Sequence, residues 1–145
     1  MLIGQPGVTM KLSDLFGKKR VEDIQRSAPF RIATEFVPYK LYANRKSSSS
    51  LNIKLKNLTS EPLMTSIVVE LPKQLSFDQM GLTKEKEVRV GDIMPNEEKQ
   101  PRVDIYSDVG TEKGEYTITV TAMAHYRDYG HVLNAMKKKT VLEVV

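Results

Sequence analysis

The chain has 145 residues, of which 40% are hydrophobic, so it is large enough to form one domain around a single buried core. It contains no cysteine, which excludes disulfides, iron–sulfur clusters, cysteine nucleophiles and thiolate zinc sites. The formal net charge is +4 at pH 7, with Lys and Arg predominant in residues 1–56 and Asp and Glu in residues 61–115. This division predicts one basic and one acidic surface, or a solvated, nonspecific pattern if folding interleaves the two segments.

The first 29 residues differ in pattern from the rest. Residues 1–11 contain two glycines and a proline and are expected to form an arm, with Met10 as an alternative start. Residues 12–26 are predicted to form a short amphipathic helix, which Pro29 would end. No signal peptide is indicated, and no apolar run approaches the ~18 residues needed to span a bilayer. We therefore expect a soluble, cytoplasmic protein.

From Phe30 onward the hydrophobic period changes to two, which is typical of half-buried strands. Val37-Pro38 interrupts the first alternating segment, so the first strand is predicted to be kinked and to lie at a sheet edge. The polar segment 43–50, ANRKSSSS, is predicted to be a loop. Further short strands are expected around 51–55, 65–71, 75–77, 88–90, 103–105, 115–126 and 140–145. Because no helix separates them, residues 30–145 are predicted to form an all-β, antiparallel sandwich of seven or eight strands.

Three segments carry a resemblance to a known family. They are LNIKLKNLTSEPLMTSIVVELPKQLSF (51–77), the proline-led turn in IMPNEEKQPRVDIYS (93–107), and Gly114-Glu115-Tyr116 at the entry to an alternating strand. The last is similar to the tyrosine corner of immunoglobulin-like domains. Residues 50–145 thus resemble the immunoglobulin-like β-sandwiches of the CARDB or alpha-galactosidase-associated type, common as accessory domains in archaea and bacteria. The resemblance implies an immunoglobulin-like fold and no shared catalytic residues.

The segment HYRDYGHVLNAMKKKT (125–140) concentrates polar and aromatic side chains. If strands precede and follow it, residues 127–136 form a hairpin loop, and such loop ends are common binding sites in sandwiches. We predict either a solvated loop or a partner-binding loop, because Tyr and Arg supply rigid area and forked hydrogen bonds. The candidate partner-binding residues are Tyr126, Arg127, Tyr129 and His131.

A metal-dependent enzyme using His125 and His131 is a further alternative for the same segment. A metal site needs about three converging ligands, and two histidines without a third do not supply them. The chain also lacks the glycine-rich patterns of phosphate-binding loops. No cofactor, metal or catalytic residue is therefore predicted.

Basic residues form a second candidate surface, which could attract nucleic acid or anionic lipid. The three consecutive lysines have another interpretation, since lysines near an edge strand discourage aggregation. The candidate basic patch consists of Arg45, Lys46, Lys54, Lys56, Lys137, Lys138 and Lys139.

Taken together, these patterns favour a non-enzymatic protein-interaction or assembly module. A protein partner is expected, and an exposed sheet edge could also pair two copies into a homodimer. The alternatives are a binder of anionic surfaces through the basic patch, and the histidine-based enzyme.

Overall fold

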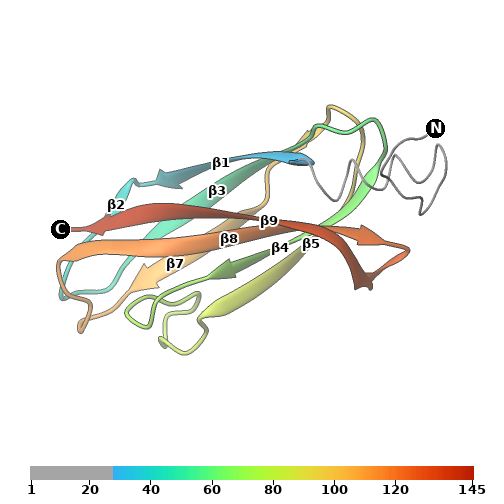
Figure 1. The fold of residues 1–145 in the computed structure, drawn as a ribbon. Helices are drawn as coiled ribbons and strands as arrows, with labels where there is room; N and C mark the ends of the chain where they lie inside the picture. The colour runs from blue at the N-terminus through green and yellow to red at the C-terminus, as the bar shows by residue number, and fades with distance from the viewer. Residues whose placement is uncertain (1–27) are drawn as a thin grey trace, which may run out of the picture.

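The computed structural model describes residues 28–145 as nine strands in two packed sheets (Figure 1). This segment contains no helix, and so none that could cross a bilayer. The predicted arm, the predicted helix over 12–26 and the question of Met10 lie outside the described residues. The strands are β1 (Phe30–Val37), β2 (Lys40–Leu41), β3 (Ser47–Asn57), β4 (Leu63–Glu70), β5 (Glu85–Ile93), β6 (Glu98–Lys99), β7 (Arg102–Ser107), β8 (Gly114–Tyr126) and β9 (Asp128–Val144).

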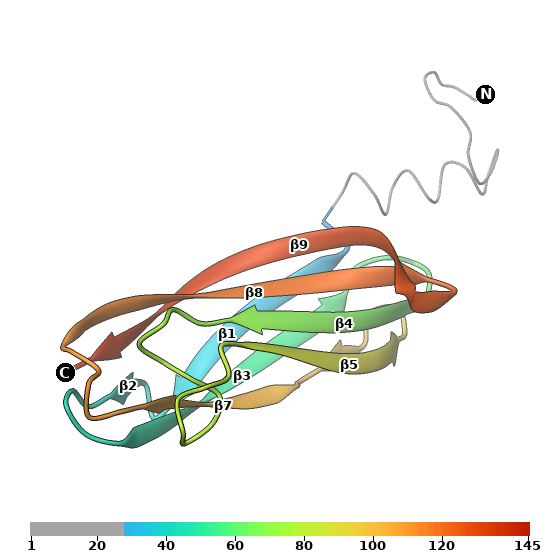
Figure 2. The ribbon, with the colours of Figure 1, turned by 90° about the horizontal axis from the view of Figure 1, so that it is seen from below.

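The first sheet, called here the β1 sheet, has β3 at its centre, with β1 on one side and β6 and β7 on the other. The second, the β9 sheet, has the order β2-β9-β8-β4-β5. All pairings are antiparallel except that of β2 with β9. Figure 2 shows β9, β8, β4 and β5 as the nearer layer, with β1, β3 and β7 behind them. The predicted all-β sandwich is confirmed, with nine strands because β2 and β6 are additional two-residue pieces.

The core lies between the sheets and follows from the two-residue alternation. Successive side chains of a strand point to opposite faces, so each apolar series is buried while its polar partners face solvent. Burying one Leu, Ile or Val side chain contributes roughly 1.5–3 kcal/mol relative to leaving it exposed. The hydrophobic side chains of the three central strands that are fully buried are Leu51, Ile53 and Leu55 on β3, Ile67 and Val69 on β4, and Ile118, Val120, Ala122 and Ala124 on β8.

The kink predicted at Val37-Pro38 is the point at which the chain changes sheets. β1 pairs only with β3, as expected of an edge strand, whereas β2 pairs with β9 in the other sheet. Proline lacks the N–H needed to continue a ladder, so the pairing of β1 ends before it. Leu41 is buried after the change, whereas Tyr39 is 69% exposed.

Two expected loops are strands in the structure. The four serines of 43–50 begin β3 and pair with β7 from Ser47 to Asn52, so the loop ends at Lys46. These serines form hydrogen bonds with β7: Ser50 Oγ donates to Asp104 Oδ1 at 2.7 Å, and the Ser47 backbone N–H donates to Ser107 Oγ at 3.0 Å. The predicted loop 127–136 is likewise wrong, because β9 begins at Asp128. The expected strand at 75–77 is instead one isolated bridge, between Ser76 and Tyr106.

Candidate functional site

The β8–β9 hairpin has a very short turn followed by a bulge. Arg127 alone separates the two strands and adopts a left-handed conformation, with φ of 72°. Tyr126 is opposite Asp128, but His125 is opposite Val132, so three extra residues lie on β9 between these pairs. A bulge of this kind bends its strand and redirects side chains. Here it turns the start of β9 over the outer face of its own sheet, as the curled end of β9 in Figure 2 shows.

Tyr129, one of the bulged residues, is fixed against this outer face. The Gly91 N–H of β5 donates to its hydroxyl oxygen at 3.1 Å, which means that the side chain reaches across β8 and β4. The Arg89 guanidinium lies 4.7 Å from its ring centroid, and the His125 ring contacts it edge-on at 5.0 Å. Three contacts from two other strands therefore hold the hairpin tip, and Tyr129 has a structural position rather than a free one.

His125 lies beneath this cover with Ser66. Ser66 Oγ is 2.6 Å from His125 Nε2, and the two residues are 0% and 7% exposed. A hydroxyl next to an imidazole is the arrangement of a nucleophile and its base. Substrate cannot reach Ser66 while Tyr129 remains in place, so in this conformation the pair fills space beneath the ring. His125 Nδ1 is buried without a hydrogen-bond partner among the described residues.

His131 lies apart from His125 and pairs with Asp128. Its Nδ1 is 2.8 Å from Asp128 Oδ1, and both side chains are largely exposed. The hydrogen bond from His131, followed by one from the Gly130 N–H, holds the pKa of Asp128 below its usual range. Within residues 28–145, no three His, Cys, Asp or Glu side chains lie close enough together to hold a metal ion.

The exposed side chains of the tip include Tyr126, Arg127, Asp128, His131 and Val132. Tyr126 is 47% exposed and Val132 is 54% exposed. The Arg127 guanidinium lies 5.2 Å from the Tyr126 ring centroid, so the two side chains present one aromatic and cationic surface. Of the four predicted partner-binding residues, Tyr126, Arg127 and His131 thus face solvent at the tip, whereas Tyr129 faces the sheet.

The predicted basic patch is not one surface in the structure. Lys54 and Lys56 lie on the outer face of the β1 sheet, Lys137–Lys139 lie on β9 in the other sheet, and Arg45 and Lys46 lie in the loop before β3. The outer faces of the two sheets point in opposite directions, so these groups cannot contact one flat anionic surface together.

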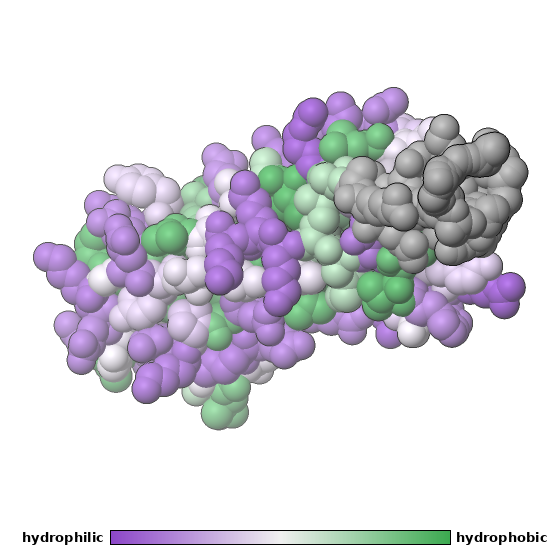
Figure 3. All heavy atoms as spheres, viewed as in Figure 1, coloured by the Kyte–Doolittle hydropathy of each residue, from purple (hydrophilic) through white to green (hydrophobic). Residues whose placement is uncertain are grey.

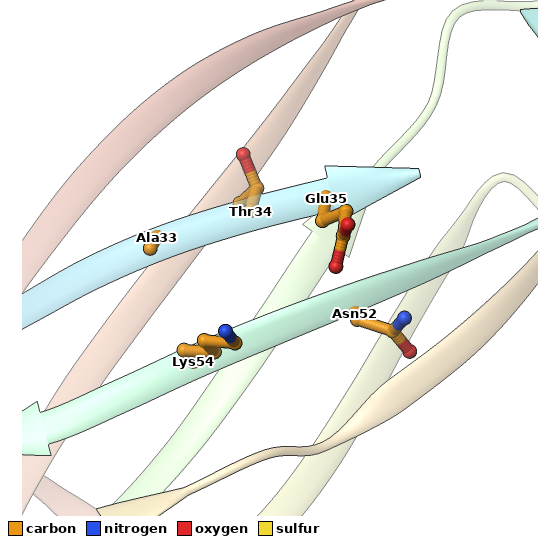
Figure 4. A pocket seen from close by; sticks show the side chains of 5 residues that line it. All are labelled: Ala33, Thr34, Glu35, Asn52 and Lys54. Atoms are coloured by element: carbon orange, nitrogen blue, oxygen red, sulfur yellow. The ribbon is translucent and has the colours of Figure 1, made fainter. Parts of the chain in front are cut away.

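The surroundings of Lys54 and Lys56 also contain acidic residues. Lys56 is flanked by Arg31 on β1 and by Glu98 on β6. Beside Lys54 is a shallow depression of about 290 Å³ between β1 and β3, which Ala33 leaves open. Figure 4 shows Glu35, Asn52 and Lys54 around it, so its rim carries one acid, one base and one amide.

The order of the strands and one tyrosine identify the fold. Strands one, two and five of an immunoglobulin sandwich form one sheet, and its third, sixth and seventh strands form the other. Here β1, β3 and β7 share one sheet, and β4, β8 and β9 share the second. Tyr116 at the start of β8 donates from its hydroxyl to the Glu112 carbonyl at 2.6 Å, which is the hydrogen bond of a tyrosine corner. The chain is an immunoglobulin-like β-sandwich.

Comparison with solved structures agrees with this fold. The Ig-like domain aligns with part of α2-macroglobulin from Escherichia coli, with a TM-score of 0.57 and 16% identity over 80% of this chain and 17% of that chain. It aligns with a FixG-related protein from Vibrio parahaemolyticus, with a TM-score of 0.52 and 11% identity over 81% and 98% of the two chains. The CARDB domain of a Pyrococcus furiosus protein, described in complex with di-metal ions, aligns at a TM-score of 0.49 with 19% identity over 80% and 89%. No protein-family model and no curated sequence matches the chain.

The opposite end of the Ig-like domain has exposed apolar residues that the sequence interpretation missed. Met80 and Leu82, in the loop between β4 and β5, are 79% and 73% exposed. The Asp78 carboxylate accepts hydrogen bonds from the Leu82 and Thr83 N–H groups at 3.0 and 2.8 Å, so this loop is ordered. Figure 3 shows a hydrophobic projection at the lower edge, where Figure 1 draws this loop. Two large apolar residues around Gly81 in DQMGL were the available signal.

Proposed function

We propose that this Ig-like domain is a non-enzymatic protein-interaction module that binds a protein partner through the β8–β9 tip. The observation that carries this proposal is that two tyrosines three residues apart in the hairpin have different positions, one packed on the sheet and one exposed. Tyr129 fixes the tip to the sheet through Gly91 and Arg89, while Tyr126 stays exposed beneath the Arg127 guanidinium. A rigid support with exposed aromatic and cationic side chains is the composition of a binding surface.

The energetics of association favour such a tip. Binding costs conformational entropy for each side chain that becomes ordered, roughly 0.5–1.5 kcal/mol for a flexible one. The stacked Tyr126–Arg127 pair is already partly ordered in the free domain. Tyr and Arg are also the residue types most often found at the energetic centre of protein interfaces. Val132 extends the same surface with apolar area.

The experiment uses a second stacked pair as a matched control. At the opposite end of the domain, the Arg45 guanidinium lies 4.2 Å from the ring of Tyr42, which is 40% exposed. We would compare wild type, Tyr126→Ala/Arg127→Ala and Tyr42→Ala/Arg45→Ala as immobilised baits, with captured proteins quantified by mass spectrometry and affinity then measured for each purified partner. We expect a partner that wild type and the control bind and the tip variant does not. Equal binding of every partner by all three proteins would reject the tip as the interaction surface.

A further inference from the structure

Two neighbouring rows on the outer face of the β9 sheet carry opposite charges at their two ends. Side chains that share this face are aligned across the strands by the pairing register. One row runs Lys139, Thr119, Glu70, Glu85 from β9 to β5. In this row the basic residue lies on β9 and the acidic residues lie on β4 and β5, with threonine on β8 between them.

The adjacent row repeats this pattern. It runs Lys137, Thr121, Val68, Glu87 over the same four strands. The lysines and the outer glutamates are exposed, whereas Thr121 and Val68 are half-buried. Strands in a sheet are ~4.8 Å apart, so about 14 Å separate the basic side from the acidic side. At that separation the lysines of β9 do not pair with these glutamates within one domain, although Arg89, in the next row on β5, lies 3.7 Å from Glu87.

This arrangement is complementary to itself. A two-fold axis parallel to the strands and lying between two facing sheets would bring β9 of one copy over β5 of the other. Lys139 of each copy would then face Glu85 of the other, and Lys137 would face Glu87, twice in one interface. A two-fold axis perpendicular to the strands would instead place lysine over lysine and is disfavoured by repulsion.

We propose that two copies of this chain associate face to face through the outer surfaces of their β9 sheets, in the orientation that pairs β9 with β5. The dimer is independent of the proposed function of the tip, because the charged residues that face each other lie on the strands and not in the tip. In this orientation the strands of the two copies run in the same direction, so both β8–β9 tips lie at the same end of the dimer. A partner with two binding sites would then bind both tips.

The free edge of β9 is less suited to pairing than its face. Lys138 lies opposite Val120, which is buried, so the lysine is on the core-facing side of β9, yet it remains exposed. A charged residue on the core-facing side of an edge strand opposes the addition of another strand, because pairing there would bury the charge. The homodimer through a sheet edge predicted from the sequence is therefore not the arrangement that β9 favours.

The dimensions of the face indicate a weak dimer. Four strands by four rows, of which two lie beneath Tyr129, cover roughly 500 Å² per copy, or about 1,000 Å² in total, which is the lower limit for a specific interface. The charged residues lie at the sides of this surface and the half-buried Thr121 and Val68 at its centre. Exposed ion pairs weaken as salt increases, so the association should be strongest at low ionic strength.

The test uses charge-reversal variants and sedimentation velocity, at protein concentrations up to roughly 500 μM because a small interface is weak. The acidic variant is Lys137→Glu/Lys139→Glu, and the basic variant is Glu85→Lys/Glu87→Lys. We expect wild type to dimerise in a concentration-dependent and salt-sensitive manner, and each variant to lose at least about tenfold in affinity. An equimolar mixture of the two variants should recover the dimer, because every facing pair is then of opposite charge.

The matched control is Lys54→Glu/Lys56→Glu on the β1 sheet, which changes the net charge by the same amount as the acidic variant. We expect this control to dimerise like wild type. The replaced residues are exposed except Lys56, which is half-buried, and far-UV circular dichroism and thermal unfolding would confirm that each variant is folded. The proposal is overturned if wild type is monomeric throughout, if both reversed variants dimerise like wild type, or if their mixture remains monomeric.

Discussion

Tyr129 provides a quantitative test of how the hairpin tip is held. Tyr129→Phe removes the acceptor of the Gly91 N–H, for which we expect a loss of ~1 kcal/mol in the free energy of unfolding. Tyr129→Ala also removes the edge-on contact with His125 and the stacking of Arg89, worth roughly 0.5–1.5 and 0.5–1 kcal/mol. The expected total is about 2–3.5 kcal/mol. For a domain of this size, 1 kcal/mol corresponds to about 4 °C in Tm, so we expect losses of ~4 °C and ~10 °C.

The assay is thermal unfolding followed by circular dichroism, with Tyr126→Phe and Tyr126→Ala as controls. Tyr126 is three residues away, in the same hairpin, and 47% exposed. Tyr126→Phe is expected to change stability by no more than ~0.5 kcal/mol, or ~2 °C, and Tyr126→Ala, which also removes the stacking of Arg127, by no more than ~1 kcal/mol, or ~4 °C. If Tyr126→Ala lowers Tm as much as Tyr129→Ala, the contacts across β8 and β4 do not anchor the tip, and the reasoning on its rigidity is wrong.

Three further predictions concern the loop between β4 and β5, the backbone at Gly91 and the tyrosine corner. Hydrogen bonds from the Thr83 side chain and then the Leu82 N–H lower the pKa of Asp78 from 3.8 to about 2. Because the folded pKa is depressed, the stabilisation by Asp78 is present above the unfolded pKa and is lost as pH falls through the folded pKa. The Tm difference between wild type and Asp78→Asn should therefore shrink between about pH 4 and 2. A difference that stays constant over this interval would contradict the assignment. Gly91 has φ of +85° with open space around it, so Gly91→Ala should cost ~1 kcal/mol in denaturant unfolding through backbone strain alone, whereas Gly110→Ala, also in open space, should be neutral; equal midpoints for the two would refute this. Tyr116→Phe should lower Tm by about 4 °C through loss of its bond to the Glu112 carbonyl, and Tyr39→Phe, at a 69% exposed residue, should not change it.

The sequence predicted the elements in which one face is buried and the other is not. In β4 and β8 every second side chain enters the core, so the alternation of apolar and polar residues marks the strand directly. Tyr116 was recognised for the same reason, because its place at the start of such a strand indicates a tyrosine corner. These signals are local, and local patterns are what a single sequence contains.

The failures occurred where strands have no such asymmetry. The middle of β9 lies at a sheet edge, where Lys137–Lys139 are all exposed and follow one another without a hydrophobic alternation. The serines at the start of β3 bond with β7, some 60 residues away, and no neighbouring residue indicates this. The contact of Tyr129 with Gly91 depends on a bulge and on the order of four strands, which together turn a predicted loop residue into a fixed one.

The long final strand has a practical consequence for studying the tip. β9 begins beside Arg127 and runs 17 residues to Val144, and Val145 is then held by backbone hydrogen bonds to Leu41 and Ala43 at the other end of the domain (Figure 1). Because β9 is bulged, β8 spans the same length in 13 residues, so at ~3.3 Å per residue these ends are about 40 Å apart. A fluorophore or surface linker joined after Val145 will therefore be remote from the hairpin, so the domain can be tethered by that residue with the tip directed into solution. The same spacing suits a fluorescent donor–acceptor pair for measuring whether the distance between the two ends of β9 changes.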